Sequence, residues 1–220
     1  MIHGILNETK EPRKSSIFST KLDGSPRFIN PRNFGGQKYN LNHHGYRNDF
    51  EFDDVKFSKV NLFFGCSHTF GVGLEQDEIY FNYIPKDDDV INVNMGIPGA
   101  GIQEISYCVG GSLNKFYNIN KIYFLVPHIG TRPYSYEQNR SFNLGYLMEQ
   151  HSDNELISMM SPKLQMEYDL FLIKQWSEYL PSAIISIEHI TSVEKKDFAK
   201  DEQHFGPITH KNISKRFYDC

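Results

Sequence analysis

Four short apolar runs divide the chain, at residues 60–64, 90–94, 122–126 and 183–187. Each run ends close to a glycine, a proline or a group of polar residues. Runs of about four to eight apolar residues with such boundaries are typical of strands buried on both faces of a sheet. The pattern therefore predicts four buried strands.

Apolar positions spaced by three and four lie between several of these runs. Residues 102–117 and 164–180 show this spacing, which predicts two amphipathic helices. A last helix is predicted over 207–218, because Pro207 suits the first turn of a helix. Strands that alternate with helices indicate a parallel sheet covered on both faces. We therefore predict an α/β fold with three layers, α/β/α, around a central parallel sheet.

Residues 1–58 have a different character. Glycines and prolines are scattered there among charges and single aromatic residues, and neither the strand period nor the helix period is sustained. The aromatic side chains have large apolar areas to bury. We therefore predict an irregular N-terminal arm over 1–58 that packs on one globular domain over 59–220.

Charge and hydropathy exclude several kinds of partner. The 220 residues carry 23 lysines and arginines against 27 aspartates and glutamates, a formal net charge of −4. This balance argues against a general nucleic-acid or anionic-membrane partner. No run approaches the roughly 20 apolar residues of a membrane span, and the first residues lack the apolar run of a signal peptide. We expect a cytoplasmic protein with no nucleic-acid or membrane partner.

Cysteine and histidine spacings give no sign of a cofactor. Cys66, Cys108 and Cys220 are an odd set at wide spacing, unlike a disulfide framework or a zinc site. The nine histidines include no His-Glu-x-x-His pattern. We therefore expect free thiols, no metal and no cofactor.

In open α/β sheets, sites form in the loops at the carboxyl ends of the strands. Ser67 lies in such a loop, because it follows the first predicted strand and Gly65. A serine at this turn presents its hydroxyl at the strand end and leaves its backbone N–H free to donate, as a nucleophile requires. The alternative is a serine that only caps a helical turn.

A second candidate pair lies near the other end of the chain. Asp201 and His204 come just before Gly206 and Pro207, where the last helix is expected to begin. A carboxylate placed there can hold Nδ1 of the imidazole and leave Nε2 free to take a proton from a serine. Taken alone, an aspartate and a histidine at this spacing are most often a solvated surface pair.

Glycines follow the second predicted strand at positions 96, 99 and 101. Such glycines let backbone N–H groups approach a ligand, and the N–H of Gly99 could stabilise an oxyanion beside the N–H of Ser67. The alternative is a plain glycine-rich turn that leads into the helix at 102.

The order of these motifs resembles that of the SGNH hydrolases, also called GDSL-type esterases. The resemblance covers about residues 60–219 and is carried by Gly65-Cys66-Ser67, by Asn94-x-Gly-x-x-Gly99 and by Asp201-x-x-His204. It implies a flavodoxin-like sheet in which Ser67 is the nucleophile. It also implies that His204 is the general base and acid, that Asp201 orients it, and that Gly99 is an oxyanion donor.

Residues 42–47 are similar to the Asn-x-x-Gly-Tyr-Arg segment that precedes this domain in some members of the family. We expect this segment to be structural, with Arg47 holding the arm on the domain.

Two positions depart from the family pattern. Cys66 replaces the aspartate that usually precedes the serine. After the third strand, residues 126–132 lack the family's Gly-x-Asn-Asp, whose asparagine amide would donate to the oxyanion. His128 or Thr131 could substitute as that donor. Loss of one such donor can cost about 10²–10³ in rate, so this gap bears directly on activity.

The sequence therefore predicts a serine esterase that hydrolyses small O-acyl esters through Ser67, His204 and Asp201. The resemblance favours acetyl esters, so the expected partner is a small-molecule or glycan acyl ester. Two alternatives stay open: an O-acyltransferase that uses the same residues, and a carbohydrate-binding or structural module with weakened catalysis. We expect His68 to be neutral beside the nucleophile and His210 to be structural.

Overall fold

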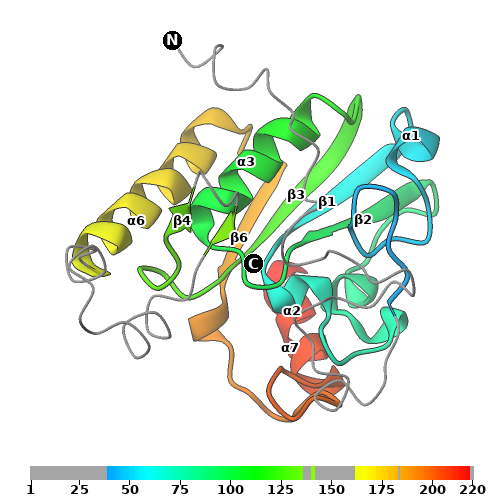
Figure 1. Ribbon diagram of the computed structural model, residues 1–220. Helices are drawn as coiled ribbons and strands as arrows, with labels where there is room; N and C mark the ends of the chain where they lie inside the picture. The colour runs from blue at the N-terminus through cyan, green and yellow to red at the C-terminus, as the bar shows by residue number, and fades with distance from the viewer. Residues whose placement is uncertain (1–38, 136–139, 142–161, 183, 219–220) are drawn as a thin grey trace.

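The computed structural model describes residues 39–135, 140–141, 162–182 and 184–218. Its centre is a four-stranded parallel sheet (Figure 1) that consists of β1 (Lys59–Gly65), β2 (Val90–Gly96), β3 (Asn118–Val126) and β6 (Ile185–His189). The order across the sheet is β2-β1-β3-β6. With the strands counted along the chain, this is the order that begins a flavodoxin-like sheet. The predicted α/β class and parallel sheet are therefore confirmed.

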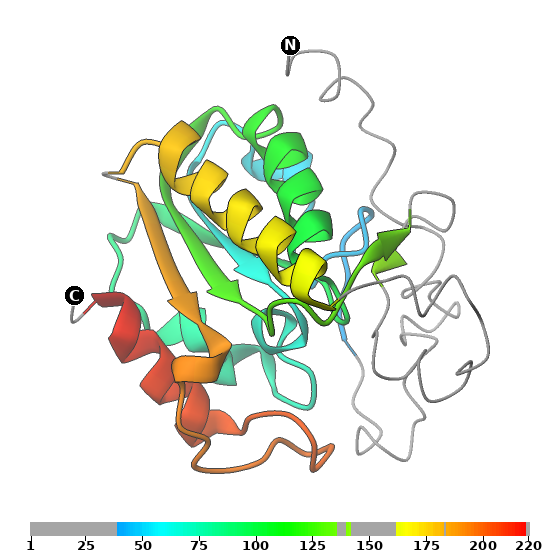
Figure 2. The ribbon, with the colours of Figure 1, turned by 90° about the vertical axis from the view of Figure 1, so that its left-hand side faces the viewer.

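Helices cover both faces of the sheet (Figures 1 and 2). α3 (Ile102–Leu113) and α6 (Pro162–Tyr179) lie side by side on one face, and α7 (Pro207–Tyr218) lies on the other. α3 ends before the predicted limit of 117, because Phe116 turns into the core and the N–H of Tyr117 donates to the Lys56 carbonyl at 2.9 Å. The three layers thus agree with the sequence-based prediction.

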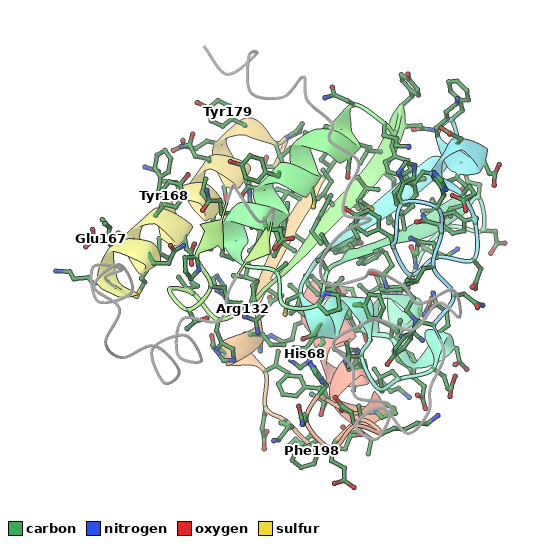
Figure 3. The ribbon with its side chains drawn as sticks, viewed as in Figure 1. His68, Arg132, Glu167, Tyr168, Tyr179 and Phe198 are labelled. Atoms are coloured by element: carbon green, nitrogen blue, oxygen red, sulfur yellow. The ribbon has the colours of Figure 1, made fainter. Side chains whose placement is uncertain are left out.

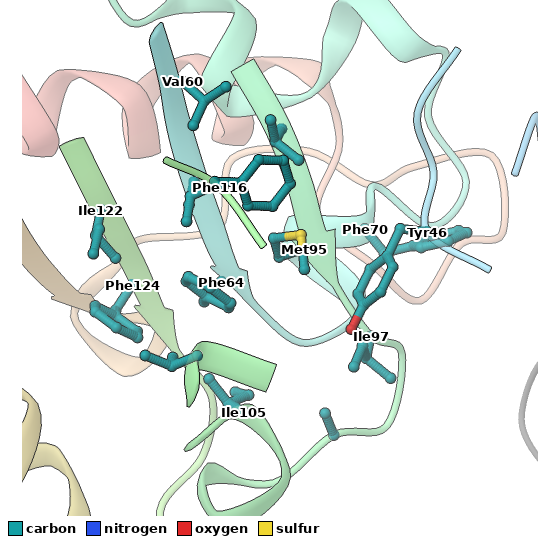
Figure 4. Close-up of a cluster of buried hydrophobic side chains, with 14 of the residues drawn as sticks. Tyr46, Val60, Phe64, Phe70, Met95, Ile97, Ile105, Phe116, Ile122 and Phe124 are labelled. Atoms are coloured by element: carbon teal, nitrogen blue, oxygen red, sulfur yellow. The ribbon is translucent and has the colours of Figure 1, made fainter. Parts of the chain in front are cut away.

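Alternate residues of the strands divide the core into two clusters, one on each face of the sheet. Leu62 and Phe64 of β1 belong to the cluster under α3 and α6, whereas Phe63 belongs to the cluster under α7. Figure 4 shows the first cluster, where Phe64 and Phe124 stack with ring centroids 5.4 Å apart. Trp176 of α6 also stacks on Phe124, with ring centroids 4.3 Å apart. Burial of each such side chain is worth about 1.5–3 kcal/mol, so this face anchors both helices.

The second cluster joins α7 to the sheet. Phe63 and Tyr123 stack at 4.6 Å, and Phe217 of α7 lies edge-on to Tyr123 at 5.4 Å. Ile213 of the same helix is fully buried in this cluster. The apolar stripe of α7 therefore fixes the start of that helix, and with it the loop before it, against the sheet.

Several shorter elements complete the described chain. They are α1 (Phe52–Val55), α2 (Ser67–Phe70), η2 (Gln76–Glu78), η3 (Tyr80–Tyr83), η4 (Ile190–Ser192) and the antiparallel pair β4 (Tyr134–Ser135) and β5 (Arg140–Ser141). The connection from β1 to β2 thus contains α2 and two 3₁₀ helices instead of one long helix, and α7 packs on η3. None of the helices in the described part of the chain combines the length and apolarity that crossing a membrane requires.

Residues 39–58, the described part of the predicted N-terminal arm, pack on the core. Tyr39, Tyr46 and Phe52 are all buried in the cluster under α3 and α6. Phe52 lies against Phe116 at 5.3 Å and against Tyr46 at the same centroid distance. Residues 1–38, the remainder of the predicted arm, lie outside the described residues.

Candidate active site

Ser67 lies at the carboxyl end of β1, as the first residue of the single-turn helix α2. Gly65 makes this turn possible, because a Cβ at that position would lie 2.1 Å from Thr69 Oγ1 and 2.8 Å from the Leu125 carbonyl. Any side chain at 65 would push α2 away from the strand end. The Ser67 side chain is only 6% exposed, and its hydroxyl contacts Cys66 Sγ at 3.8 Å.

The N-terminal arm holds the other end of α2. The Arg47 guanidinium donates to the main-chain oxygens of Gly71 at 2.5 Å and Leu74 at 2.8 Å. It also lies over the Tyr39 ring, 4.6 Å from the centroid. Burial lowers the pKa of Arg47 to about 10, so the side chain stays charged at neutral pH. The expectation that Arg47 holds the arm on the domain is therefore confirmed.

Asp201 and His204 lie in the loop before α7, and their side chains are hydrogen-bonded to each other. His204 Nδ1 contacts Asp201 Oδ2, and Asp201 Oδ1 accepts the backbone N–H groups of Gln203 at 3.2 Å and His204 at 3.0 Å. The turn is strained, since Glu202 has a φ of 59°, in the left-handed region. Asp201 thus holds both the ring and the backbone of His204.

The charge of Asp201 suits this role. The carboxylate is 5% exposed, and burial on its own would raise the pKa of Asp201. Its hydrogen bonds with the ring and backbone of His204 outweigh burial and lower the pKa of Asp201 below the ordinary value. Asp201 is therefore ionised at neutral pH, and Nε2 is the ring nitrogen of His204 that remains for chemistry.

His68 lies between the nucleophile candidate and the Asp201–His204 pair. Its ring is edge-on to His204 with centroids 5.3 Å apart, and it packs on Phe205 at 4.3 Å. Its Nδ1 is buried and has no hydrogen-bond partner among the residues that the structure describes. Burial is the main cause that lowers the pKa of His68 well below its ordinary value, and the neighbouring His204 adds to the effect. His68 is therefore neutral at pH 7, as the sequence predicts.

The fold brings the widely separated residues of the predicted triad to one end of the sheet. Asp201 and His204 are in contact, and His68 connects this pair to Ser67, its neighbour in the chain. No hydrogen bond joins the Ser67 hydroxyl to His204 in the structure, where that hydroxyl faces Cys66 instead. One of the two contacts of the triad is thus formed.

Gly99 occupies a tight turn after β2. The Ala100 N–H donates to the Ile97 carbonyl at 3.0 Å, and Gly99 has a φ of 80°, which together describe a type II turn with Pro98 before the glycine. The Ile97 N–H donates to the Gly65 carbonyl at 3.0 Å, so the turn is fixed to the end of β1. Within the described residues, the N–H of Gly99 has no hydrogen-bond acceptor.

The sequence suggested His128 or Thr131 as an oxyanion donor, but the residue of the loop after β3 that contacts the Gly99 turn is a different one. His128 and Thr131 are exposed, and Thr131 Oγ1 donates to the His128 carbonyl at 3.1 Å. Arg132 instead reaches the Gly99 turn, where its Nη1 donates to the Ala100 carbonyl at 3.2 Å. Sequence reasoning passed over Arg132, because its direction depends on the packing of its backbone against Gly101, which is distant in the chain.

His210 is structural, as the sequence predicts. Its Nδ1 accepts the backbone N–H of Tyr80 at 3.2 Å, and the side chain is fully buried in α7. Burial lowers the pKa of His210 to about 3. Although His68, His204 and His210 lie close together, no group of three or more His, Cys, Asp or Glu side chains in the described ranges could hold a metal ion.

Comparisons with known proteins do not assign a function to the chain. No protein-family model matches the chain. No curated protein matches it either. Among solved structures, it is similar to a carbohydrate acetylesterase family member from Sinorhizobium meliloti, with 11% sequence identity over 71% of this chain and 94% of the other, and a TM-score of 0.39. The function of the chain therefore has to be derived from its own site.

Proposed function

We propose that the protein is a serine esterase that hydrolyses small O-acyl esters, in particular acetyl esters of carbohydrates. The contact between Asp201 and His204 carries this proposal. A buried, ionised carboxylate on Nδ1 fixes the tautomer of the imidazole and stabilises the imidazolium that forms when Nε2 takes a proton. The His204 ring lies 5.3 Å from the ring of His68, which follows Ser67 in the chain at the end of β1. A base and an orienting carboxylate next to a serine are the groups that activate a weak nucleophile.

The reaction proceeds in two halves. The Ser67 oxygen attacks the ester carbonyl carbon while His204 Nε2 takes the hydroxyl proton, and the imidazolium then gives that proton to the departing alcohol oxygen. The bond between the acyl carbon and the alcohol oxygen breaks, which leaves the acyl group on Ser67. A water molecule attacks this acyl-enzyme in the same way, so that the carboxylic acid leaves and Ser67 is regenerated.

Backbone donors serve the negative oxygen of each tetrahedral intermediate. The N–H of Ser67 lies in the first turn of α2, and the N–H of Gly99 is without an acceptor within the described chain. Such preoriented donors stabilise the oxyanion more than the neutral carbonyl. In place of the family's asparagine, His128 is proposed as a third donor, because Thr131 Oγ1 already donates its proton to the His128 carbonyl.

The position of the Ser67 side chain bears on both the mechanism and the substrate. Its hydroxyl faces Cys66 and must rotate toward His204 before the proton can move. The low exposure of Ser67 favours a small acyl group such as acetyl, because a long chain would need more room next to the hydroxyl.

A fluorophosphonate probe, which reacts covalently with activated serines, tests the proposal. The wild type is expected to be labelled and Ser67→Ala is expected not to be. Ser177→Ala serves as the matched control, because Ser177 is exposed on α6 and its hydroxyl donates a hydrogen bond to the Ile173 carbonyl of the same helix. Equal labelling of the wild type and Ser67→Ala would reject this mechanism.

A binding module is the second candidate, and one observation favours it: no hydrogen bond joins Ser67 to His204. In that case, a panel of aryl and sugar acetates gives no turnover above that of Ser67→Ala, while a glycan still binds. Turnover that disappears in Ser67→Ala rejects the binding module.

A further inference from the structure

A positively charged side chain at the edge of the candidate active site forms no ion pair with any other described residue. Arg132 is half-buried in the loop after β3, and its hydrogen bond in the described chain goes to a neutral carbonyl, that of Ala100. The ion pairs formed among the described residues do not include it. Partial removal of a charge from water is costly unless a partner of opposite charge is supplied. A ligand that binds there can supply that partner.

Both ends of Arg132 are held in place. A Cβ at Gly101 would lie 2.2 Å from the Arg132 carbonyl oxygen and 3.0 Å from Arg132 Cβ, so the missing side chain at 101 lets the Arg132 backbone pack on the start of α3. At the other end, the guanidinium is tied to Ala100. Asp169 of α6 also fixes the loop, since it accepts the Gly130 N–H at 2.8 Å. A cation held in this way loses little freedom when it binds a ligand.

The N–H donors of Arg132 that do not contact Ala100 lie along one edge of the guanidinium. The guanidinium has five N–H donors, and the contact with Ala100 uses Nη1. Nε and Nη2 have no acceptor in the described part of the chain. Together they form the side of the guanidinium that binds a carboxylate through two parallel hydrogen bonds.

This edge lies near the proposed nucleophile. Arg132 and His68 appear close together at the same end of the sheet in Figure 3, and Arg132 is one of the positive charges that, after burial, lower the pKa of His68. His68 is the neighbour of Ser67 in the chain, and Arg132 is bonded to Ala100, the neighbour of Gly99. A group bound to Arg132 therefore lies at the end of the sheet that carries Ser67, next to the turn that contains Gly99.

We propose that Arg132 binds a carboxylate of the substrate, and that the protein deacylates O-acyl esters of acidic sugars, in which a carboxylate and the acylated hydroxyl belong to the same ring. This inference rests on the proposed esterase function. The carboxylate pairs with Arg132 while the ester carbonyl lies at Ser67 and Gly99. A neutral sugar ester leaves Arg132 without its counter-ion.

The test compares two esters that differ in one group: a mono-O-acetylated methyl glucuronide and the methyl glucoside acetylated at the same hydroxyl. For the wild type, kcat/KM is expected to be about 10- to 100-fold higher for the acidic ester, the size of one charge-assisted bidentate contact. Arg132→Gln is expected to bring the ratio of the two kcat/KM values close to one. Arg132→Lys is expected to keep part of the ratio, because the charge remains and the paired donors do not.

Lys174→Gln is the control, because it also removes one positive charge but lies exposed on α6, paired with Glu178. Its ratio is expected to equal that of the wild type. A wild-type ratio near one, or a ratio that Arg132→Gln leaves unchanged, overturns the proposal. Thermal unfolding of each variant shows whether it is folded.

The two proposals fail in different ways. If the wild type hydrolyses neither ester, the esterase function fails, and binding of the carboxylate is then measured directly by titrating the protein with glucuronate and with glucose. Binding of glucuronate that is stronger than that of glucose and is lost in Arg132→Gln supports the role of Arg132. Equal or absent binding of the two sugars overturns it.

Discussion

The side-chain amide of Asn48 pairs through both of its polar atoms with the main chain of Asn94. Asn48 Oδ1 accepts the Asn94 N–H and Asn48 Nδ2 donates to the Asn94 carbonyl, each at 2.9 Å. β2, which contains Asn94, is an edge strand of the central sheet, so its outer main-chain groups have no neighbouring strand. The arm thus completes the strand that leads to the Gly99 turn.

Replacing Asn48 with alanine is expected to lower the free energy of unfolding by about 2–4 kcal/mol, because two buried main-chain groups lose their partners. Urea denaturation measures the change. Asn40→Ala is the matched control, since Asn40 is exposed and its side chain donates to exposed Asp49, and we expect it to change stability by less than about 0.5 kcal/mol. Equal effects of the two substitutions would show that the pairing with Asn94 adds no stability.

Gly65→Ala is expected to destabilise the protein by about 1–3 kcal/mol and to lower esterase activity, because the new methyl group collides with Thr69 and with the Leu125 carbonyl. Gly111→Ala makes the same chemical change inside α3, where a Cβ meets nothing within 4 Å. There the substitution is expected to stabilise the helix by about 0.5–1 kcal/mol. Thermal unfolding compares the two variants, and a stable, active Gly65→Ala would contradict the tight turn that places Ser67.

Asp201→Asn is expected to lower kcat for an aryl acetate by about 10⁴-fold, because an amide keeps the shape of the carboxylate but favours the wrong tautomer of His204. The variant is expected to remain folded, since an amide oxygen can still accept the backbone N–H groups of Gln203 and His204. Glu202→Gln removes the adjacent, exposed charge and is expected to leave kcat within about twofold of the wild type. A small effect of Asp201→Asn would mean that Asp201 does not orient the base.

Acid is expected to destabilise the fold through His210. Its pKa is about 3 in the folded protein because of burial, against about 6.5 in the unfolded chain, so the unfolded state binds more protons between these values. Above pH 6.5, His210 is neutral in both states and costs no stability. As the pH falls from 6.5 to 4.5, the preferential protonation of His210 in the unfolded chain lowers the free energy of unfolding by about 2–3 kcal/mol. His68, whose pKa burial also lowers, acts in the same direction.

Urea denaturation over a pH series measures this loss. His210→Gln keeps an acceptor side chain without a titrating group, so its free energy of unfolding is expected to change less between pH 6.5 and 4.5 than that of the wild type. His43→Asn is the control, because His43 is exposed, and its pH dependence is expected to match the wild type. An unchanged pH dependence in His210→Gln would exclude His210 as the source.

The main elements could be predicted from the sequence because their burial is regular. Strands buried on both faces read as apolar runs, and α7 begins at Pro207 as expected. β3 begins at Asn118, earlier than its apolar run, because its polar first residues pair with β1 rather than enter the core. The sequence indicates the single turn of α2 only through the helical turn considered next to Ser67, and it gives no sign of the 3₁₀ helices, since turns of three or four residues carry no periodic signal.

The candidate site was predicted in part for a related reason. Residues such as Asp201 and His204 are close in the chain, so a local turn is enough to join them. The direction of Arg132 is set by Gly101 and Ala100, about 30 residues away, and the orientation of Ser67 depends on the rotamer that faces Cys66. Neither the direction of Arg132 nor the rotamer of Ser67 can be predicted from a single sequence, because neither produces a periodic pattern or a local motif.

Arg47 holds the end of α2 and the residues that follow it through the carbonyl oxygens of Phe70, Gly71 and Leu74, and its guanidinium also lies 5.7 Å from the centroid of the Phe70 ring. This contact depends on the side chains of the segment as well as on its backbone, because a Cβ at Gly71 would lie 3.1 Å from Arg47 Nη1 and residues 70–74 are all buried. Residues 70–74 therefore tolerate little substitution, and changes to the rim of the site have to be made at exposed positions outside this segment.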